Sequence, residues 1–403
     1  MVQGNAILVV DLGNSSTKGM VLFGKDSKTG KYRERQFDIP NVFAAIPENY
    51  EVSSDYNDMT STILRCDTEL NGLKITGCFC NGELQEKEFS LNTIRPTAKR
   101  KKYDLDSTVL SYRLAFLFAC KAIMSMQNIT DYDQLKELSW TVVTLLPPGD
   151  LDNGRVKLAN IVKDINSIDI IYPQVNLPVK TNNVYIFPEG YCAYAGVVYD
   201  KGHTFRPDYQ FLTEETVLVI DIGAGTTDIC MIQDNKLVQN SKYTIDLGGN
   251  NVEKKVKDYL LQDGLMLDVR DVQTGVIKGF VKDGAKKVSV IDYVNRAKRD
   301  VAGGIIRNII DYLESKDINA RTIGYVLICG GGSINDSEAP EINSLSNNIM
   351  EQFKQFVPNS EVIDIPLHTV KKEMEDGDIK TVEEPINPRD LNLVGASILA
   401  EVI

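Results

Sequence analysis

The stretch VLVIDIGAGTTD at residues 217–228 decides the fold of this chain. Its first four residues are apolar and mostly β-branched, and they predict a buried strand that runs into a glycine turn. The strand ends at the Asp221 carboxylate, and Gly223 and Gly225 allow a tight turn with backbone N–H groups directed outward. The pattern predicts a phosphate-binding turn in which Asp221 holds Mg²⁺ through water. The other residues expected to face the phosphate are Ala224, Thr226 and Thr227.

The chain contains the same pattern a second time, as ILVVDLGNSSTK at residues 7–18. Both copies continue into apolar residues, so they predict β-hairpins and not the strand-to-helix loop of a GxxxxGK[ST] or GxGxxG motif. The repeat predicts two like domains whose hairpins grip a nucleotide from both sides of a cleft. The candidate ligand-binding residues of the first turn are Asp11, Gly13, Asn14, Ser15, Ser16 and Lys18.

Composition narrows the class of protein. The 403 residues carry 44 Lys and Arg against 56 Asp and Glu, a net charge of −12. Direct, non-specific binding to nucleic acid is disfavoured, because that affinity depends on basic side chains. We interpret the one basic run, at residues 99–102, as a solvated face.

Cysteine and histidine usage points away from metal and thiol chemistry. Seven scattered cysteines without a CxxC motif fit a reducing compartment, and only His203 and His368 are present, both in polar stretches. Zinc sites and Cys–His or Ser–His catalysis are therefore not expected. The N-terminus lacks the features of a signal peptide, and no apolar run approaches 18 residues, so we expect a cytoplasmic protein without membrane contact.

Periodicity and turn residues predict the elements between the hairpins. In the first half we expect an extended stretch at 37–46, a hairpin around Asn81-Gly82, helices at 109–126 and 151–165, strands at 140–146 and 184–187, a closely packed small-residue helix after Pro188, and a polar linker at 201–213. In the second half we expect a helix through 252–260, a helix at 290–313 interrupted by Gly303-Gly304, a strand at 323–329, a helix at 344–356, an acidic loop at 371–388 and a closing helix at 391–402.

Four charged residues are candidates for chemistry, and each has a structural alternative. Asp11 and Asp221 would hold Mg²⁺ and orient the attacking water, or would only cap their own turns. Lys18 would neutralise a phosphate, or would be a solvent-facing strand lysine. Glu189 would polarise water for in-line attack, or would only favour a helix dipole.

The order of these motifs resembles the actin superfamily of ATPases. The matching segments are 11–18, 188–190, 221–228, 247–250 and 330–333, with 391–399 resembling the second interdomain helix. The opening Asp-Leu-Gly-Asn-x-x-x-Lys and the length are most similar to ParM (StbA-like) plasmid-segregation proteins of bacteria. The resemblance implies an α/β, two-domain actin-like fold (duplicated, ribonuclease-H-like) with a central nucleotide cleft. Domain I would comprise residues 1–200 and 390–403, and domain II residues 201–389.

The resemblance also implies ligands and roles. ATP, or GTP, and Mg²⁺ would occupy the cleft, with Asp11 and Asp221 associated with the metal and Glu189 positioning water. Residues 296–299 resemble the stretch by which DnaK-type chaperones contact adenine, which makes Lys298 a candidate. The nucleotide-facing glycine turn would be formed by Gly248, Gly249 and Asn250, and the adenosine loop by Gly330, Gly331, Gly332 and Ser333.

The function implied is a filament-forming ATPase that polymerises with ATP, hydrolyses it in the polymer and separates plasmid copies. A DNA-binding adaptor, and not this chain, would contact the DNA. The alternative is a small-molecule kinase or another non-polymerising ATPase of the superfamily. A DnaK-type chaperone is disfavoured because no peptide-binding segment follows, and an FtsA- or MreB-like membrane filament because the terminal helix is not amphipathic.

Overall fold

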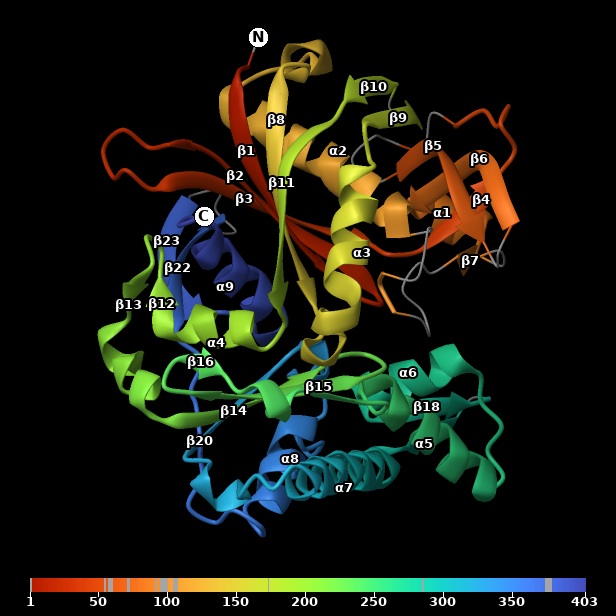
Figure 1. The fold of residues 1–403 in the computed structure, drawn as a ribbon. Coiled ribbons are helices and arrows are strands. Elements are labelled where there is room, and N and C mark those ends of the chain that lie inside the picture. The colour runs from red at the N-terminus through yellow and green to blue at the C-terminus, as the bar shows by residue number, and fades with distance from the viewer. Residues whose placement is uncertain are drawn as a thin grey trace. The chain divides into compact units, whose positions relative to one another are not determined.

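The computed structural model describes residues 2–53, 56, 61–70, 73–90, 93–94, 101–103, 108–172, 174–284, 286–373 and 379–403. Residue contacts divide the chain into two compact units (Figure 1). Unit 1 comprises residues 1–188, 201–204 and 396–403, and unit 2 comprises 189–200 and 205–395. The basic run at 99–102 lies partly outside the described residues.

The main sheet of unit 1 contains the first repeat. Its strand order is β11-β8-β1-β2-β3, with β1 antiparallel to β2 and parallel to β8. The strands are β1 (Gly4–Leu12), β2 (Ser16–Lys25), β3 (Tyr32–Pro40), β8 (Leu138–Leu146) and β11 (Lys180–Pro188). The near-continuous apolar runs of β1 and β8 are buried, as expected for strands covered on both faces. The predicted strand–turn–strand unit is confirmed here.

A second sheet in unit 1 has the order β10-β9-β5-β6-β4-β7. Its strands are β4 (Phe43–Ile46), β5 (Ser61–Leu70), β6 (Leu73–Gly82), β7 (Thr93–Ile94), β9 (Ser167–Tyr172) and β10 (Val175–Pro178). The hairpin predicted at Asn81-Gly82 is wrong, because β6 ends there and α1 (Glu83–Glu88) begins. The Asn81 amide donates instead to the carbonyls of Pro40 and Val42, both at 2.7 Å. Gly82, at φ 80°, makes the turn into the helix.

Two longer helices complete unit 1, and both match the sequence expectation. They are α2 (Thr108–Gln127), which packs against β2 and β3, and α3 (Leu151–Lys163), which packs against β11. By length and composition α2 is the one helix among the described residues that would suffice to cross a membrane, yet 67% of its apolar window is buried, as in a core helix. Short 3₁₀ turns precede β8 and α3, at η1 (Tyr132–Leu135) and η2 (Pro148–Asp150).

Unit 2 is built on the second repeat. Its sheet order is β16-β15-β14-β20-β21, with β17 also paired to β15. The strands are β14 (Thr216–Ile222), β15 (Thr227–Gln233), β16 (Lys236–Leu237), β17 (Tyr243–Ile245), β20 (Tyr325–Cys329) and β21 (Glu361–Val362). β14 is antiparallel to β15 and parallel to β20, the same relation that β1 has to β2 and β8. The duplication predicted from the two hairpins is therefore present in the topology.

The helices of unit 2 follow the sequence expectation with two exceptions. They are α4 (Tyr191–Val198), α5 (Gly249–Gln262), α6 (Val269–Lys278), α7 (Ile291–Ser315), α8 (Leu345–Phe353) and the first half of α9 (Leu391–Ala400). No helix was predicted where α6 lies. The interruption predicted at Gly303-Gly304 is wrong, because α7 is continuous. These glycines serve packing: a Cβ at Gly304 would lie 2.8 Å from Cδ1 of Leu247. The close helix crossing is confirmed, since a Cβ at Gly196 would lie 2.9 Å from the Leu391 carbonyl oxygen.

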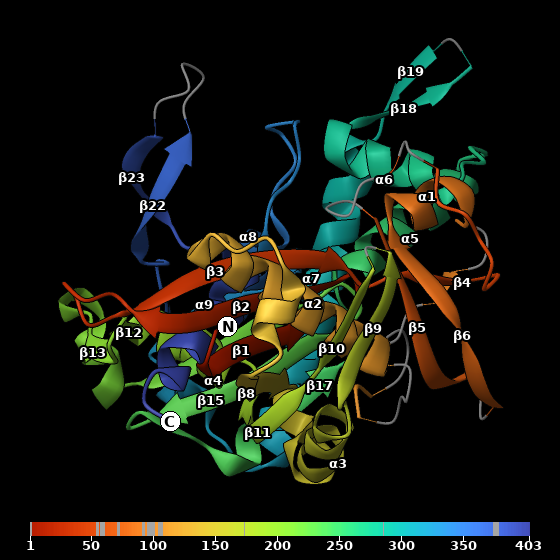
Figure 2. The same ribbon diagram turned by 90° about the horizontal axis from the view of Figure 1, so that it is seen from above.

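Smaller elements fill the connections. The acidic stretch predicted as a loop at 371–388 instead holds most of a two-stranded ribbon, β22 (Leu367–Glu373) and β23 (Ile379–Pro385), which projects in Figure 2. The β-branched residues of the two strands, among them Val370, Ile379 and Val382, favour a strand that the acidic composition obscured. The remaining elements are β12 (Tyr199–Asp200), β13 (Thr204–Phe205), η3 (Pro207–Glu214), η4 (Gln239–Ser241), β18 (Phe280–Asp283), β19 (Lys286–Ser289), η5 (Ala320–Thr322), η6 (Gly331–Ser333) and η7 (Pro388–Asp390).

Candidate functional site

The hairpin of unit 2 presents a buried carboxylate at a tight turn. Asp221 is 8% exposed and lies near the end of β14, where it pairs in register with Asp228. The turn closes when the Gly223 N–H donates to the Thr226 carbonyl at 2.8 Å. The Thr227 hydroxyl, expected to face a phosphate, donates instead to the Leu247 carbonyl at 2.7 Å. In this structure Thr227 therefore fixes the hairpin to the following turn.

That following turn, at residues 248–250, sits directly on the hairpin. The Gly249 and Asn250 N–H groups donate to the carbonyls of Gly223 and Ala224, at 3.0 and 2.7 Å. A Cβ at Gly248 would lie 2.7 Å from the Gly223 carbonyl oxygen, so only glycine fits this approach. The glycine turn expected near the nucleotide is thus held against the phosphate turn, with two of its N–H groups engaged by that turn.

The triple glycine at residues 330–332 packs against the Asp221 carboxylate and its turn. Gly330 adopts φ +86°, and a Cβ there would lie 2.2 Å from Oδ1 of Asp221. A Cβ at Gly332 would lie 3.1 Å from the Gly223 carbonyl oxygen, and the Ser333 hydroxyl donates to the Gly330 carbonyl at 2.7 Å. Segments 248–250 and 330–333, which are distant in sequence, therefore both pack against the hairpin turn at 221–226, and Gly330 lies beside Asp221.

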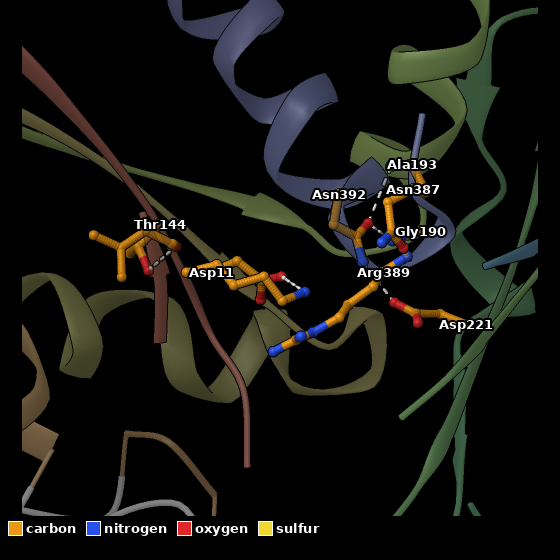
Figure 3. Close-up of polar contacts among 10 residues, drawn as sticks. Asp11, Thr144, Gly190, Ala193, Asp221, Asn387, Arg389 and Asn392 are labelled. Carbon is orange, nitrogen blue, oxygen red and sulfur yellow. Dashed lines mark hydrogen bonds and ion pairs between the residues drawn. The ribbon is translucent and has the colours of Figure 1, made fainter. Parts of the chain in front are cut away.

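Asn392 is a site residue that sequence reasoning missed. Its amide nitrogen donates to Oδ2 of Asp221 at 2.5 Å, and its amide oxygen accepts from the Gly190 and Ala193 N–H groups at 2.9 and 3.1 Å (Figure 3). Glu189, itself buried, immediately precedes this helix start. The available signal was an amide side chain in the largely apolar run of α9.

Lys298 lies in the middle of α7 and is 7% exposed. Its ammonium donates to Oδ1 of Asn335 at 3.2 Å. Burial lowers the pKa of Lys298 to about 8, against a smaller opposing effect of the Asp336 charge. A buried cation bonded to a neutral amide is available for a negatively charged or polar ligand, but its expected contact with adenine stays a prediction.

The hairpin of unit 1 repeats the turn with different chemistry. The Gly13 N–H donates to the Ser16 carbonyl at 2.9 Å, matching the turn of unit 2. Asp11 pairs in register with Lys18, and the two form a buried ion pair at 3.5 Å. The alternative of a solvent-facing lysine is therefore excluded. The Asn41 amide supports the turn by donating to the Gly13 carbonyl at 2.9 Å.

The hairpin of unit 2 fits a hydrated Mg²⁺ with a phosphate ligand. Among the described residues there is no group of three or more His, Cys, Asp or Glu able to hold a metal by themselves. Mg²⁺ characteristically uses one or two carboxylates and completes its shell with water and phosphate oxygens. The buried Asp221, with glycine backbone packed beside it, matches that donor set, and Asp11 is the equivalent carboxylate of the unit 1 hairpin.

Comparisons with known proteins establish the fold. Residues 219–336 match the family model described as the C-terminal domain of archaeal actin homologue MreB-like proteins. No curated protein matches the chain in sequence. Similar solved structures include the apo psk41 ParM protein, with 14% identity, 99% of this chain and 97% of that chain covered, and a TM-score of 0.59.

Two further structures have the same fold. The 15-stranded ParM filament from Clostridium botulinum matches with 16% identity, full coverage of both chains and a TM-score of 0.61. An archaeal actin homolog in complex with ADP matches with 14% identity, 98% of each chain covered and a TM-score of 0.57. The chain therefore has the actin-like fold, and the resemblance found in its two hairpins is confirmed at that level.

Proposed function

We propose that this chain is a nucleotide-dependent, filament-forming actin-like protein that binds ATP with Mg²⁺ and hydrolyses it on polymerisation. The observation that carries the proposal is the packing of two glycine segments against the Asp221 hairpin turn in unit 2, together with the matching hairpin in unit 1. A buried carboxylate beside a glycine turn suits a hydrated metal and its phosphate ligand.

The roles proposed follow from residue chemistry. Asp11 and Asp221 bind the hydrated metal, and Glu189 orients the attacking water. Mg²⁺ supplies neutralisation of the phosphate charge when it is bound. Lys18 adds a cation to the phosphates and must then be shared between them and Asp11, its partner in this structure.

The biological role proposed is plasmid segregation in the bacterial cytoplasm, through self-assembly and a DNA-binding adaptor. Two kinds of support bear on it. The fold neighbours include a ParM filament, and an ADP complex is known for another neighbour. The net charge of −12 disfavours direct contact with nucleic acid, which leaves the DNA to a partner.

Light scattering at 90° combined with pelleting and phosphate release tests this proposal. We expect scattering to rise with Mg²⁺ and ATP above a critical concentration, and to decay as phosphate appears. Glu189→Ala should lengthen the plateau by at least 10-fold, since positioned acid–base groups contribute about 10²–10⁴-fold to rate. Glu214→Ala, at an exposed position of the same unit, is the matched control.

Binding of ATP without polymer at any concentration would reject the filament. A small-molecule kinase would then become the better hypothesis, to be tested by a screen of phosphate acceptors.

A further inference from the structure

Asn392 connects two parts of unit 2 that the proposed reaction requires. One end of its amide donates to Oδ2 of Asp221 at 2.5 Å. The other end accepts from the N–H groups of Gly190 and Ala193, which open α4 directly after Glu189. The carboxylate proposed for the metal and the segment proposed to orient water thus bond to the same side chain.

An amide is the side-chain group suited to this position. Asn392 is buried, and a buried polar group is costly unless its hydrogen bonds are made. Its NH₂ supplies the donor that an ionised carboxylate accepts, and its carbonyl accepts from the two N–H groups at the helix start. An aspartate would keep the second set of bonds but would lose the donor to Asp221.

The other oxygen of Asp221 is also restricted. The Gly330 backbone packs so closely that a Cβ there would lie 2.2 Å from Oδ1. Asn392 fixes Oδ2 while Gly330 blocks movement of Oδ1, so the carboxylate has little freedom to rotate. Preorganised groups of this kind matter because small misplacements of reacting groups cost large factors in rate.

We propose that Asn392 is a positioning residue. It orients the Asp221 carboxylate toward the metal, and it holds the segment that carries Glu189 in a fixed position relative to Asp221. This inference rests on the proposed function. Asn392 does not touch the reacting atoms, and it acts through Asp221 and the start of α4.

The decisive variant is Asn392→Asp, assayed at pH 8 for phosphate release and for the Mg²⁺ dependence of ATP binding. It places a carboxylate where the amide donor lies, and we expect turnover to fall 10- to 100-fold while ATP affinity at saturating Mg²⁺ changes less than threefold. The Mg²⁺ concentration for half-maximal ATP binding should shift at least fivefold, because Asp221 is no longer held toward the metal.

Asn319→Asp is the matched control, since it makes the same change of side chain and the Asn319 amide oxygen accepts from the Arg321 N–H at an exposed turn of unit 2. It should leave both turnover and the Mg²⁺ dependence of ATP binding within twofold of wild type.

Two results would overturn the inference. The first is Asn392→Asp turnover within twofold of wild type. The second is a loss of turnover with an unchanged Mg²⁺ dependence of ATP binding, which would indicate a structural role alone. If Asn392→Asp does not fold, Asn392→Ser takes its place, and the Mg²⁺ concentration for half-maximal ATP binding should rise at least fivefold; an unchanged value rejects the inference.

The same binding measurement separates this inference from the proposed function. A wild-type protein that binds ATP but releases no phosphate rejects the proposed hydrolysis, while the Mg²⁺ dependence of ATP binding in Asn392→Asp, expected to shift at least fivefold at pH 8, still decides the role of Asn392. Failure of the wild type to bind ATP with Mg²⁺ would overturn both.

Discussion

The two hairpins of this protein have one backbone plan and two chemistries. In each hairpin the aspartate near the end of the first strand pairs with the residue seven positions later, and the glycine two positions after the aspartate closes the turn through its N–H. In unit 1 the paired residue is Lys18, which neutralises Asp11. In unit 2 the paired residue is Asp228, and Asp221 is held instead by Asn392 and by glycine backbone.

The difference shows two ways of stabilising a buried carboxylate. The first hairpin uses a local ion pair supplied within the motif itself. The second uses neutral groups from residues 330 and 392, which are more than a hundred positions away in sequence. Substitutions that remove either the ion pair or the neutral groups measure how much each contributes to stability.

The largest effect is expected for Gly330→Ala. The added Cβ would collide with Oδ1 of Asp221 and with the Ile222 carbonyl oxygen, at 2.2 and 2.4 Å, in a left-handed conformation. We expect the free energy of unfolding to fall by about 4 kcal/mol. Urea denaturation followed by circular dichroism measures it.

Gly264→Ala is the control for Gly330→Ala. Gly264 has φ +84° with no atom within 4 Å of its Cβ position, so its cost should be only about 1 kcal/mol, from backbone conformation. Equal losses for the two variants would show that the contact with Asp221 contributes nothing.

Lys18→Met tests the ion pair of the first hairpin. It leaves the buried Asp11 carboxylate without its cation, and breaking a buried pair costs about 3 kcal/mol of unfolding free energy. Thr244→Val removes a neutral donor to Asp228 in the second hairpin and should cost about 1 kcal/mol. Denaturation curves of the two variants compare ionic with neutral support, and a larger loss for Thr244→Val would contradict the comparison.

A smaller effect than that of Lys18→Met, and of opposite sign, is expected for Lys298→Met, because Lys298 is bonded to an amide and Lys18 is ion-paired. Burial holds the pKa of Lys298 at about 8 in the folded chain, below its usual 10.5. The folded state therefore resists protonation, and the variant should be more stable by about 2 kcal/mol at pH 7, after loss of the Asn335 hydrogen bond.

The pH dependence of this gain has a defined sign. Between pH 8 and 10.5 the unfolded state binds the proton more than the folded state, so wild-type stability rises relative to the variant. The stability that Lys298→Met gains over the wild type should be complete below pH 8 and absent above pH 10.5. Thermal unfolding at pH 7 and pH 10 measures it, and a gain independent of pH would show that the charge is not the cause.

The sequence by itself determined the duplication and the fold. The apolar run, aspartate and spaced glycines of each hairpin are local signals, because strand burial and turn geometry depend on neighbouring residues. Both hairpins were predicted from them, most of the long helices from apolar periodicity, and the actin-like fold from the resemblance of the motif order to a known family. Local composition also led to two wrong predictions, a hairpin at Asn81-Gly82 and a helix break at Gly303-Gly304. In the structure the Asn81 amide bonds to the carbonyls of Pro40 and Val42, and Gly304 allows close packing against Leu247.

Only the tertiary structure decided which residues meet at Asp221. Asn392 lies in an apolar helix whose pattern gives no reason for its amide, and its partners are about 170 and 200 residues away. The engagement of the Thr227 hydroxyl by Leu247, and of the Gly249 and Asn250 N–H groups by the hairpin, likewise depends on how the segments pack. Hydrogen bonds between distant segments form where burial demands a partner, and no local pattern specifies which partner that is.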